Sequence, residues 1–363
     1  MIELLVDSLF DAGKILFKCI KECIPKNENE KTKEEWLEFL TSIEITNKAK
    51  QKIEYCKTVD NTIIFRVPHG ISVNDIKPKE IYFKDFLNAT RLEYEIKNNW
   101  LSMKIYNEFL PEKVNFELLE PDRKGLKVNL GKSYDGLATI DFNITPHVLL
   151  AGATNSGKSV CTHVMLVQLY NNYPDLRFYL ADMKKVELLN YRNLNNTVKY
   201  VDTLEGVTEV VDELLEECDR RYELLGKEGC KKLETYNKKV SKYRRLKPIV
   251  FVVEECVRLI SDKELQKKLA ELLFIARACG IYIILTIQRP TKACLSPEIK
   301  SSLGNIIGLK TVNKRNSECI CDDNRLKDLR GFGHGWVWND LGETEFQGYY
   351  IDESDIDKYL KGL

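Results

Sequence analysis

Residues 147–159 read HVLLAGATNSGKS, and this stretch decides the fold. Residues 147–151 predict a buried strand, residues 152–159 match the pattern GxxxxGKS, and residues 160–169 predict an apolar helix. A glycine-containing loop between a strand and a helix turns its backbone N–H groups toward phosphates, and the helix dipole favours the same anion. The stretch therefore predicts a site for a nucleoside triphosphate.

The side chains of this loop suggest individual roles. We expect Lys158 to reach the β- and γ-phosphates and to act in catalysis, and the Ser159 hydroxyl to ligate Mg²⁺. The candidate nucleotide-binding residues are Gly152, Ala153, Thr154, Asn155, Ser156, Gly157, Lys158, Ser159 and Val160.

Two further predicted strands end in polar residues. Residues 249–253 are apolar and precede Glu254, which we assign to the Mg²⁺ side, and Glu255, which we assign to activation of the attacking water. Asp is the usual residue on the metal side, so Glu254 adds a methylene to that contact. The strand predicted at 281–287 precedes Gln288, which we expect to sense the γ-phosphate. The candidate catalytic residues are therefore Lys158, Glu255 and Gln288.

Strands and helices alternate from about residue 136 almost to the C-terminus. The predicted strands are 147–151, 177–182, 198–202, 249–253, 281–287 and 305–311, and the main helices are 204–225 and 262–279. Continuous Val, Ile and Leu runs separated by helices are typical of a parallel sheet buried on both faces. We expect an α/β fold with a mainly parallel sheet covered by helices on both sides.

The N-terminal third is organised differently. Residues 2–20 show the periodicity of an amphipathic helix, which packs on its own protein or a sister subunit, or lies on a membrane surface. Strands expected at 62–67, 91–96 and 100–106 and a helix at 73–87 indicate a small α+β domain without a catalytic constellation. The expected segments are 1–32 (helix and linker), 33–118 (small domain) and 119–363 (nucleotide-binding domain).

Composition restricts the classes of function. The 363 residues carry 55 basic and 55 acidic side chains, so the overall positive charge of a small nucleic-acid-binding domain is missing. Charged and polar residues interrupt every apolar run, so we expect no transmembrane segment and no signal peptide. The 11 cysteines include no CxxC pair, which favours reduced thiols over a disulfide scaffold. We expect a cytoplasmic protein, with peripheral attachment to a membrane through the N-terminal helix as the alternative.

The combined motifs resemble the FtsK/SpoIIIE family of DNA-translocating ATPases over about residues 120–352. Beyond the phosphate loop and the strand ends, the similar segments are 182–188 (with Met183 where the family has proline), 219–222, 236–237, 277–281, 286–290 and 331–335. The resemblance implies a RecA-like P-loop ATPase motor that uses ATP and Mg²⁺. It also implies a homo-oligomer, usually a hexameric ring, that threads double-stranded DNA.

The sequence departs from the family in two further motifs. Glu254 and Glu255 replace an Asp-Glu pair, and Ser317-Glu318 replaces a Ser-Arg pair, so Arg315 and Arg277 become the candidates for an arginine acting in trans. Because the chain ends soon after residue 350, we expect no winged-helix module. We also expect no membrane spans, so the chain resembles the shorter FtsK-like proteins of plasmids, phages and other mobile elements.

The distribution of charge along the chain indicates whether the protein has a surface that could bind DNA. Residues 219–247 contain 11 basic and 4 acidic side chains, an excess of +7 in a neutral protein. Sequence-independent binding to DNA rests on such phosphate contacts. The candidate DNA-binding residues are Lys231, Lys232, Lys238 and Lys239; a solvated surface balanced by acidic neighbours is the alternative.

Three functions fit these observations. The first is an ATP-driven, ring-forming translocase of double-stranded DNA that serves plasmid, phage or conjugative-element transfer or maintenance. The second is a coupling ATPase of a conjugation or secretion apparatus, with a membrane channel or relaxosome as partner. The third is a nucleotide-gated DNA-binding switch with little hydrolysis.

Overall fold

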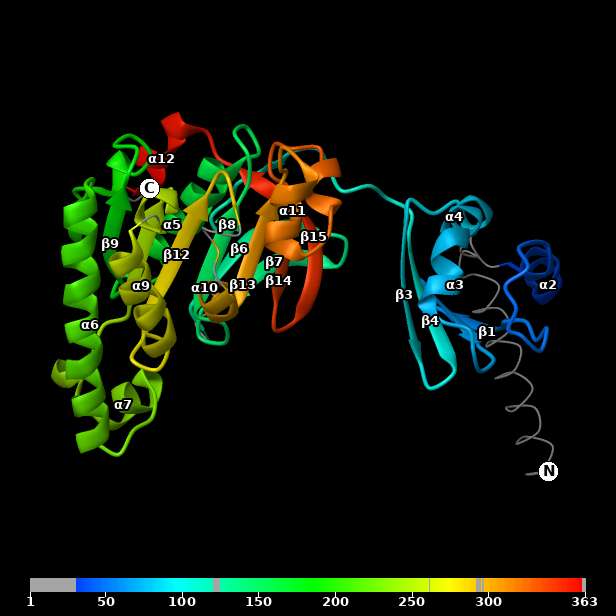
Figure 1. Ribbon diagram of the computed structural model, residues 1–363, viewed down its shortest axis with the longest axis horizontal. Coiled ribbons are helices and arrows are strands. Elements are labelled where there is room, and N and C mark those ends of the chain that lie inside the picture. Colours follow the sequence, from blue (N-terminus) through cyan, green and yellow to red (C-terminus); the bar gives the residue numbers. More distant parts are fainter. Residues whose placement is uncertain (1–30, 120–124, 261, 292–294, 296, 361–363) are drawn as a thin grey trace, which may run out of the picture. The chain divides into compact units, whose positions relative to one another are not determined.

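The computed structural model describes residues 31–119, 125–260, 262–291, 295 and 297–360. The helix expected at 2–20 lies outside the described residues. The chain divides into two compact units, Met1–Phe109 and Leu110–Leu363, which are described separately below (Figure 1).

The first unit is a four-stranded antiparallel sheet packed against helices. In sheet order its strands are β1 (Glu54–Val59), β2 (Thr62–Arg66), β4 (Trp100–Tyr106) and β3 (Arg91–Lys97), and its helices are α2 (Lys33–Ser42), α3 (Val73–Ile76) and α4 (Glu80–Leu87). The helix expected at 73–87 is interrupted by a 3₁₀ turn at Lys77–Lys79, because Pro78 has no backbone N–H to donate. The fully buried rings of Trp36, Phe65 and Phe83 form the centre of its core.

The second unit contains a large mixed sheet whose central part is parallel. The parallel strands run in the order β10 (Thr197–Val201), β9 (Arg177–Asp182), β11 (Ile249–Glu254), β12 (Ile281–Ile287), β8 (His147–Ala151) and β13 (Asn305–Leu309). These are the strands that the sequence predicts, to within two residues at each end. The predicted α/β fold class is confirmed.

Antiparallel strands, which the sequence analysis did not anticipate, extend this sheet beyond β13. They are β14 (His334–Asn339), β15 (Gly342–Tyr350), β6 (Lys127–Ser133) and β7 (Gly136–Asp141), and the short β5 (Val114–Asn115) pairs with β15. Because β5 pairs with β15 and the Phe116 N–H donates to the Tyr350 carbonyl at 2.8 Å, residues 110–118 belong to the second unit. The division therefore falls at Phe109/Leu110 and not at the expected 118/119.

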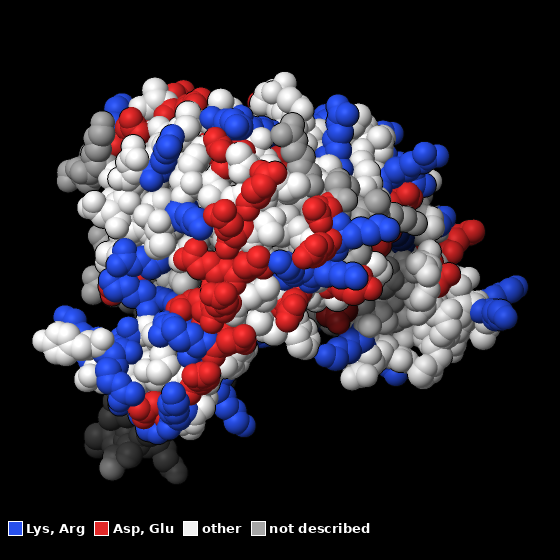
Figure 2. All heavy atoms as spheres, turned by 60° about the vertical axis from the view of Figure 1, so that its left-hand side comes forward, with Lys and Arg blue, Asp and Glu red and all other residues white. Residues whose placement is uncertain are grey.

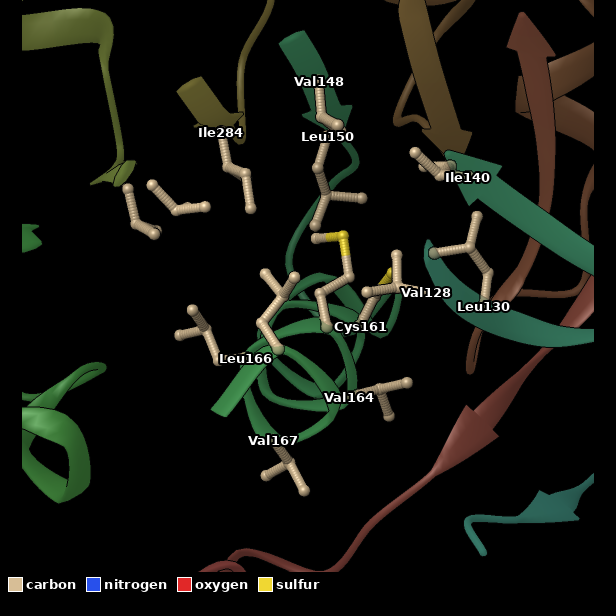
Figure 3. Close-up of a cluster of buried hydrophobic side chains, with 14 of the residues drawn as sticks. Val128, Leu130, Ile140, Val148, Leu150, Cys161, Val164, Leu166, Val167 and Ile284 are labelled. Atoms are coloured by element: carbon tan, nitrogen blue, oxygen red, sulfur yellow. The ribbon is translucent and has the colours of Figure 1, made fainter. Parts of the chain in front are cut away.

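Helices cover both faces of the parallel strands. On one face lie α5 (Lys158–Asn172) and α12 (Glu353–Leu360), and on the other lie α6 (Leu204–Lys227), α8 (Val257–Ile260), α9 (Lys263–Ile275), α10 (Pro297–Ser302) and α11 (Lys314–Cys321). Val148 and Leu150 of β8 point to α5, as Figure 3 shows, whereas Leu149 and Ala151 belong to the opposite core. Among the described helices, none combines the length and apolar character that crossing a membrane requires.

Parallel pairing brings the candidate site together at one edge of the sheet. The phosphate loop follows β8, Glu254 ends β11 beside Asp182 at the end of β9, and Gln288 follows β12. In sheets of this kind, ligands bind at the carboxyl ends of the strands. The fold thus places the predicted functional residues on the edge where chemistry is expected.

The contact between β6 and β15 can be tested with a pair of glycine substitutions. A Cβ at Gly131 would lie 2.0 Å from the Gln347 carbonyl oxygen, whereas one at Gly226 in α6 would meet no atom within 4 Å. We expect Gly131→Ala to lower the free energy of unfolding by about 1–3 kcal/mol through overpacking. The control Gly226→Ala should raise it by up to about 1 kcal/mol. Chemical denaturation measures both, and equal stability of the two variants would contradict the strand pairing.

Candidate nucleotide-binding site

The phosphate loop is held in place by backbone hydrogen bonds from three neighbouring segments. The Gly152 N–H donates to the Ile287 carbonyl at 3.1 Å, and the Ala153 N–H donates to the Lys310 carbonyl at 2.8 Å. The Gly333 N–H donates to the Ser156 carbonyl at 2.8 Å. Gly157 has φ +99°, and a Cβ there would lie 2.6 Å from the Gly333 nitrogen. The loop conformation therefore requires glycine at 157 and the close approach of residue 333.

The loop leads directly into a long helix that favours an anion. Helix α5 begins at Lys158, so its first backbone N–H groups lie at the loop, where the helix dipole is positive. The Ser156 hydroxyl is buried and has no hydrogen-bond partner within the described part of the chain. A bound phosphate would satisfy such a group, because an unpaired buried donor is costly. The residues present therefore fit a nucleotide.

Lys158 and Glu254 form a buried ion pair behind the loop. Their side chains are 3% and 1% exposed, and the Lys158 ammonium bonds directly to Oε1 of Glu254. The Thr286 hydroxyl donates to the second carboxylate oxygen of Glu254 at 2.6 Å and lies 3.3 Å from Lys158 Nζ. The predicted phosphate-binding lysine and the predicted metal-side carboxylate are thus brought together.

Glu255 lies beside this pair in a different environment. It has φ +61°, and its N–H donates to Thr286 Oγ1 at 3.0 Å. The Gln288 backbone N–H donates to Oε1 of Glu255 at 3.5 Å, while Oε2 is buried without a partner among the described residues. Burial raises the pKa of Glu255 despite the nearby Lys158. A free oxygen with a raised pKa is suited to accepting a proton.

A cavity of about 520 Å³ adjoins Glu255. Met183, Lys184 and Lys185, from the turn that follows β9, line its other side. The carboxylate expected to activate water therefore lies next to a space that water can fill.

This turn also carries residues that the sequence analysis placed in a family motif without assigning them a role. The Glu187 carboxylate pairs with Lys184 Nζ at 3.0 Å. Lys184 Nζ also lies 3.8 Å from Oε1 of Glu254. Burial acts to raise the pKa of Glu187, but its polar neighbours, Lys184 among them, lower it overall. The spacing D-x-K-x-x-E-L at 182–188 is the sequence signal that could have pointed to these residues.

Oxygen donors for Mg²⁺ meet at the same place. Ser159 supplies a hydroxyl in the first turn of α5, and Glu187 and Glu254, which both contact Lys184, supply carboxylates; these are the ligand types that Mg²⁺ prefers. Searched over its described residues, the chain has no group of three His, Cys, Asp or Glu side chains that could hold an ion alone. Mg²⁺ in nucleotide sites is held by one or two side chains plus substrate phosphates, so the site fits this cation.

The two candidate arginines lie at opposite edges of the sheet. Arg315 is exposed in the first turn of α11, which follows the carboxyl end of β13 and so shares the edge of the phosphate loop. Arg277 is exposed before β12, at the other edge, and donates to the Ile144 carbonyl at 2.9 Å. That either arginine acts on the nucleotide of a neighbouring subunit stays a prediction.

The candidate DNA-binding lysines are exposed around α7 (Leu233–Lys239), beyond the end of α6. Lys231, Lys232 and Lys238 form no salt bridge with any described residue, whereas Lys239 contacts Glu228. Acidic side chains form a band on the face shown in Figure 2, and lysines and arginines gather at its lower end. Lysines and arginines also lie elsewhere on this face, so this end is a local concentration of positive charge and not the whole of it.

Two residues in the basic stretch differ from the rest. Arg221 is buried, where it pairs with Glu217 at 2.7 Å and donates to the Cys279 carbonyl at 2.8 Å, so it serves the fold. Tyr243, which the sequence analysis did not single out, is 99% exposed beside Lys242 and Arg244.

Comparison with known proteins identifies related sequences. Residues 112–320 match the FtsK/SpoIIIE family. Over 278 residues the chain is 32% identical to DNA translocase FtsK of Treponema pallidum, covering 73% of this chain and 34% of that protein. It is 31% identical to DNA translocase FtsK of Chlamydia trachomatis, covering 70% of this chain and 35% of that protein. The chain thus spans about a third of the length of these relatives.

Solved structures share the fold. The pCW3 conjugation coupling protein TcpA, in a monomer form with ATPgS, has a TM-score of 0.66 at 23% identity, covering 91% of this chain and 98% of that one. The cytoplasmic domain of the type VII secretion ATPase EccC of Thermomonospora curvata has a TM-score of 0.58 at 24% identity, covering 67% of this chain and 31% of that one. At these identities the likeness concerns the fold alone.

The raised pKa of Glu255 predicts a pH-dependent effect on stability. Because the folded protein disfavours the charged carboxylate, ionisation above the ordinary pKa of about 4.3 lowers folding stability. We expect Glu255→Gln to melt at a higher temperature than the wild type at pH 7, with the difference vanishing as the pH falls below that value.

Thermal denaturation without nucleotide between pH 4 and pH 8 measures this effect. Glu216→Gln, at an exposed position of α6, is the control and should show no such trend. A Glu255→Gln variant that melts at or below the wild-type temperature at pH 7 would contradict the assignment.

Proposed function

The chain belongs to the FtsK/SpoIIIE family, and on that premise we propose that it is an ATP-driven translocase of double-stranded DNA. The observation that carries the proposal is the meeting of the phosphate loop, the Lys158–Glu254 pair and the free oxygen of Glu255 at one sheet edge. Nucleotide binding and water activation need these groups together. Relatives named DNA translocase support DNA as the substrate.

Binding of ATP follows from the loop. The backbone N–H groups at the start of α5, from Gly157 to Val160, would bind the phosphates, because those of Gly152 and Ala153 already bond to Ile287 and Lys310. Lys158 exchanges part of its contact with Glu254 for the β- and γ-phosphates. Ser159 and Glu254 would hold Mg²⁺, which supplies charge neutralisation on the phosphates when bound. Thr286 keeps Glu254 in place through its second oxygen as the lysine shifts.

Hydrolysis is assigned to Glu255 and its neighbours. Its unpaired Oε2 accepts a proton from water held in the adjoining cavity, and its raised pKa favours that transfer. Lys158 stabilises negative charge on the γ-phosphate as the water attacks in line. The backbone contact between Gln288 and Glu255 supports Gln288 as the residue that senses the γ-phosphate, because a change at one strand end reaches the other directly.

Translocation requires a ring and a DNA-facing surface. We assign the DNA contacts to the basic end around α7, where Lys231, Lys232, Lys238 and Lys239 are exposed. A homo-oligomer, most simply a hexameric ring, multiplies this charge around a channel, and phosphate contacts let the motor pass any sequence. Arg315 shares the nucleotide edge, which favours it over Arg277 as the arginine that acts on a neighbouring subunit.

A coupling role is the second candidate. The coupling protein TcpA shares the fold over nearly the full length of both chains, including the small N-terminal unit. In this role the protein works in the cytoplasm at a membrane channel or relaxosome, with the segment 1–32 as its docking element. Deletion of residues 1–25 should then abolish co-sedimentation with membranes while leaving ATPase activity unchanged; retained co-sedimentation would exclude this docking.

The ATPase rate with and without double-stranded DNA tests the leading proposal. We expect DNA to stimulate hydrolysis, Lys158→Ala to bind no nucleotide, and Glu255→Gln to bind ATP and hydrolyse it at least about 10²-fold more slowly, because general-base catalysis contributes about 10²–10⁴. Normal turnover by Glu255→Gln would refute its role. An ATPase rate that does not change when DNA is added would instead favour the nucleotide-gated switch with little hydrolysis.

The basic end is tested through the salt dependence of DNA binding. A variant with Lys231→Gln, Lys232→Gln and Lys238→Gln should bind duplex DNA more weakly, and the slope of log K against log salt should become shallower by up to about 3. The matched control replaces the exposed Lys263 and Lys267 of α9 with Gln. Fluorescence anisotropy at several salt concentrations gives both slopes. An unchanged slope in the triple variant would show that DNA does not contact this surface.

A further inference from the structure

Phe332 combines an exposed aromatic ring with a strained backbone. Its side chain is 80% exposed, and its φ is +51°. Among the described residues other than glycine, every other positive φ belongs to a charged residue or an asparagine. For a bulky apolar residue such an angle is a genuine outlier, and strained residues of this kind gather at functional sites. The backbone angle therefore marks Phe332 as a candidate functional residue.

The segment around Phe332 is fixed against the phosphate loop. Gly331 and Gly333 have φ +90° and +87°, so three consecutive residues adopt positive φ. The Phe332 carbonyl accepts a hydrogen bond from Nε2 of the buried Gln347 at 2.7 Å, and the Gly333 N–H donates to the Ser156 carbonyl. A glycine at the middle position would adopt the same conformation without strain. The local backbone therefore gives no reason for a phenylalanine at 332.

Packing gives no reason for the ring either. Within the described part of the chain, Phe332 belongs to none of the hydrophobic clusters that form the cores of the two units. Its ring stays in water, where an aromatic face gains free energy when another planar group covers it. The ring is thus available to a ligand.

The position of Phe332 fits the base of a nucleotide held by the loop. Phe332 precedes β14, whose Gly335 pairs with Leu309 at the end of β13, so it shares the edge that carries the phosphate loop. A Cβ at Gly157 would lie 3.4 Å from the Phe332 carbonyl carbon, which places Phe332 beside the residue that precedes α5. Backbone N–H groups at this point bind the α- and β-phosphates. The nucleoside, which is attached to the α-phosphate, therefore begins close to Phe332.

We propose that the Phe332 ring stacks on the base of the bound nucleotide. The inference rests on the proposed nucleotide site and adds the residue that contacts the base. Stacking of a base on an aromatic ring tolerates any base, because every base has a π-face. Removal of the ring should therefore weaken the binding of a nucleoside triphosphate and leave the binding of inorganic tripolyphosphate, which has no base, unchanged.

The test measures the affinities for ATPγS and for inorganic tripolyphosphate by calorimetry, both with Mg²⁺. Phe332→Ala should bind ATPγS about 5–100-fold more weakly, the usual loss when a ring that stacks on a base is removed, and should bind tripolyphosphate as the wild type does. Phe332→Tyr keeps the ring and should keep the affinity for ATPγS. The matched control Phe274→Ala removes a ring that is 81% exposed on α9 and should change neither affinity.

A glycine variant separates the ring from the strained backbone. Phe332→Gly relieves the strain that Phe332→Ala retains, and both variants lack the ring. Equal losses of ATPγS affinity in the two variants would therefore assign the effect to the ring. A loss in Phe332→Ala alone would assign it to the backbone and overturn the inference.

Three further outcomes are distinguishable. An equal weakening of ATPγS and tripolyphosphate binding would place the effect of Phe332 on the phosphates and overturn the inference. Unchanged ATPγS affinity in Phe332→Ala, together with altered self-association in light scattering, would assign the ring to a contact with a second copy of this chain and also overturn it. A wild type that binds neither ligand would refute the proposed nucleotide site itself.

Discussion

The buried ion pair between Lys158 and Glu254 is the interaction on which the site depends. Moving a charged group out of water costs several kcal/mol, and only a close, fully hydrogen-bonded partner offsets that cost. Here the partner comes from a different strand, and Thr286 satisfies the remaining carboxylate oxygen. The pair can form only when α5, β11 and β12 are all in place. The nucleotide site therefore reaches its geometry only when the sheet is correctly assembled.

The antiparallel half of the sheet supports the phosphate loop from the other side. Gly333, at the start of the β14–β15 hairpin, donates to the loop at Ser156 and accepts from the Gly348 N–H at 2.9 Å. Arg330 extends this support, because its guanidinium donates to the carbonyls of Leu110 and Pro111. The first residues of the second unit are thus bonded to the segment that holds the loop.

Local sequence identified most of the residues that the fold gathers at the candidate nucleotide site. The loop, Glu254, Glu255 and Gln288 each follow an apolar run, and the fold unites them because carboxyl ends of parallel strands share an edge. The antiparallel strands were missed even though β6–β7 and β14–β15 are local hairpins; what no local pattern reveals is the pairing of β6 with β15, far along the chain. The same cause shifted the domain boundary. Arg221 shows the opposite case. Its positive charge suggests a contact with DNA, but the side chain is buried and therefore stabilises the fold.

By itself, the sequence determined the α/β class, the phosphate loop and the identity of the acidic and amide residues at the strand ends. These features depend on the order of residues along a few continuous segments, so short stretches of sequence are sufficient to reveal them. Only the tertiary structure decided that Lys184 contacts both Glu187 and Glu254, that Lys158 pairs with Glu254, and that Gly333 supports the loop. These contacts join segments from different strands, and their formation depends on the register and packing of the whole sheet.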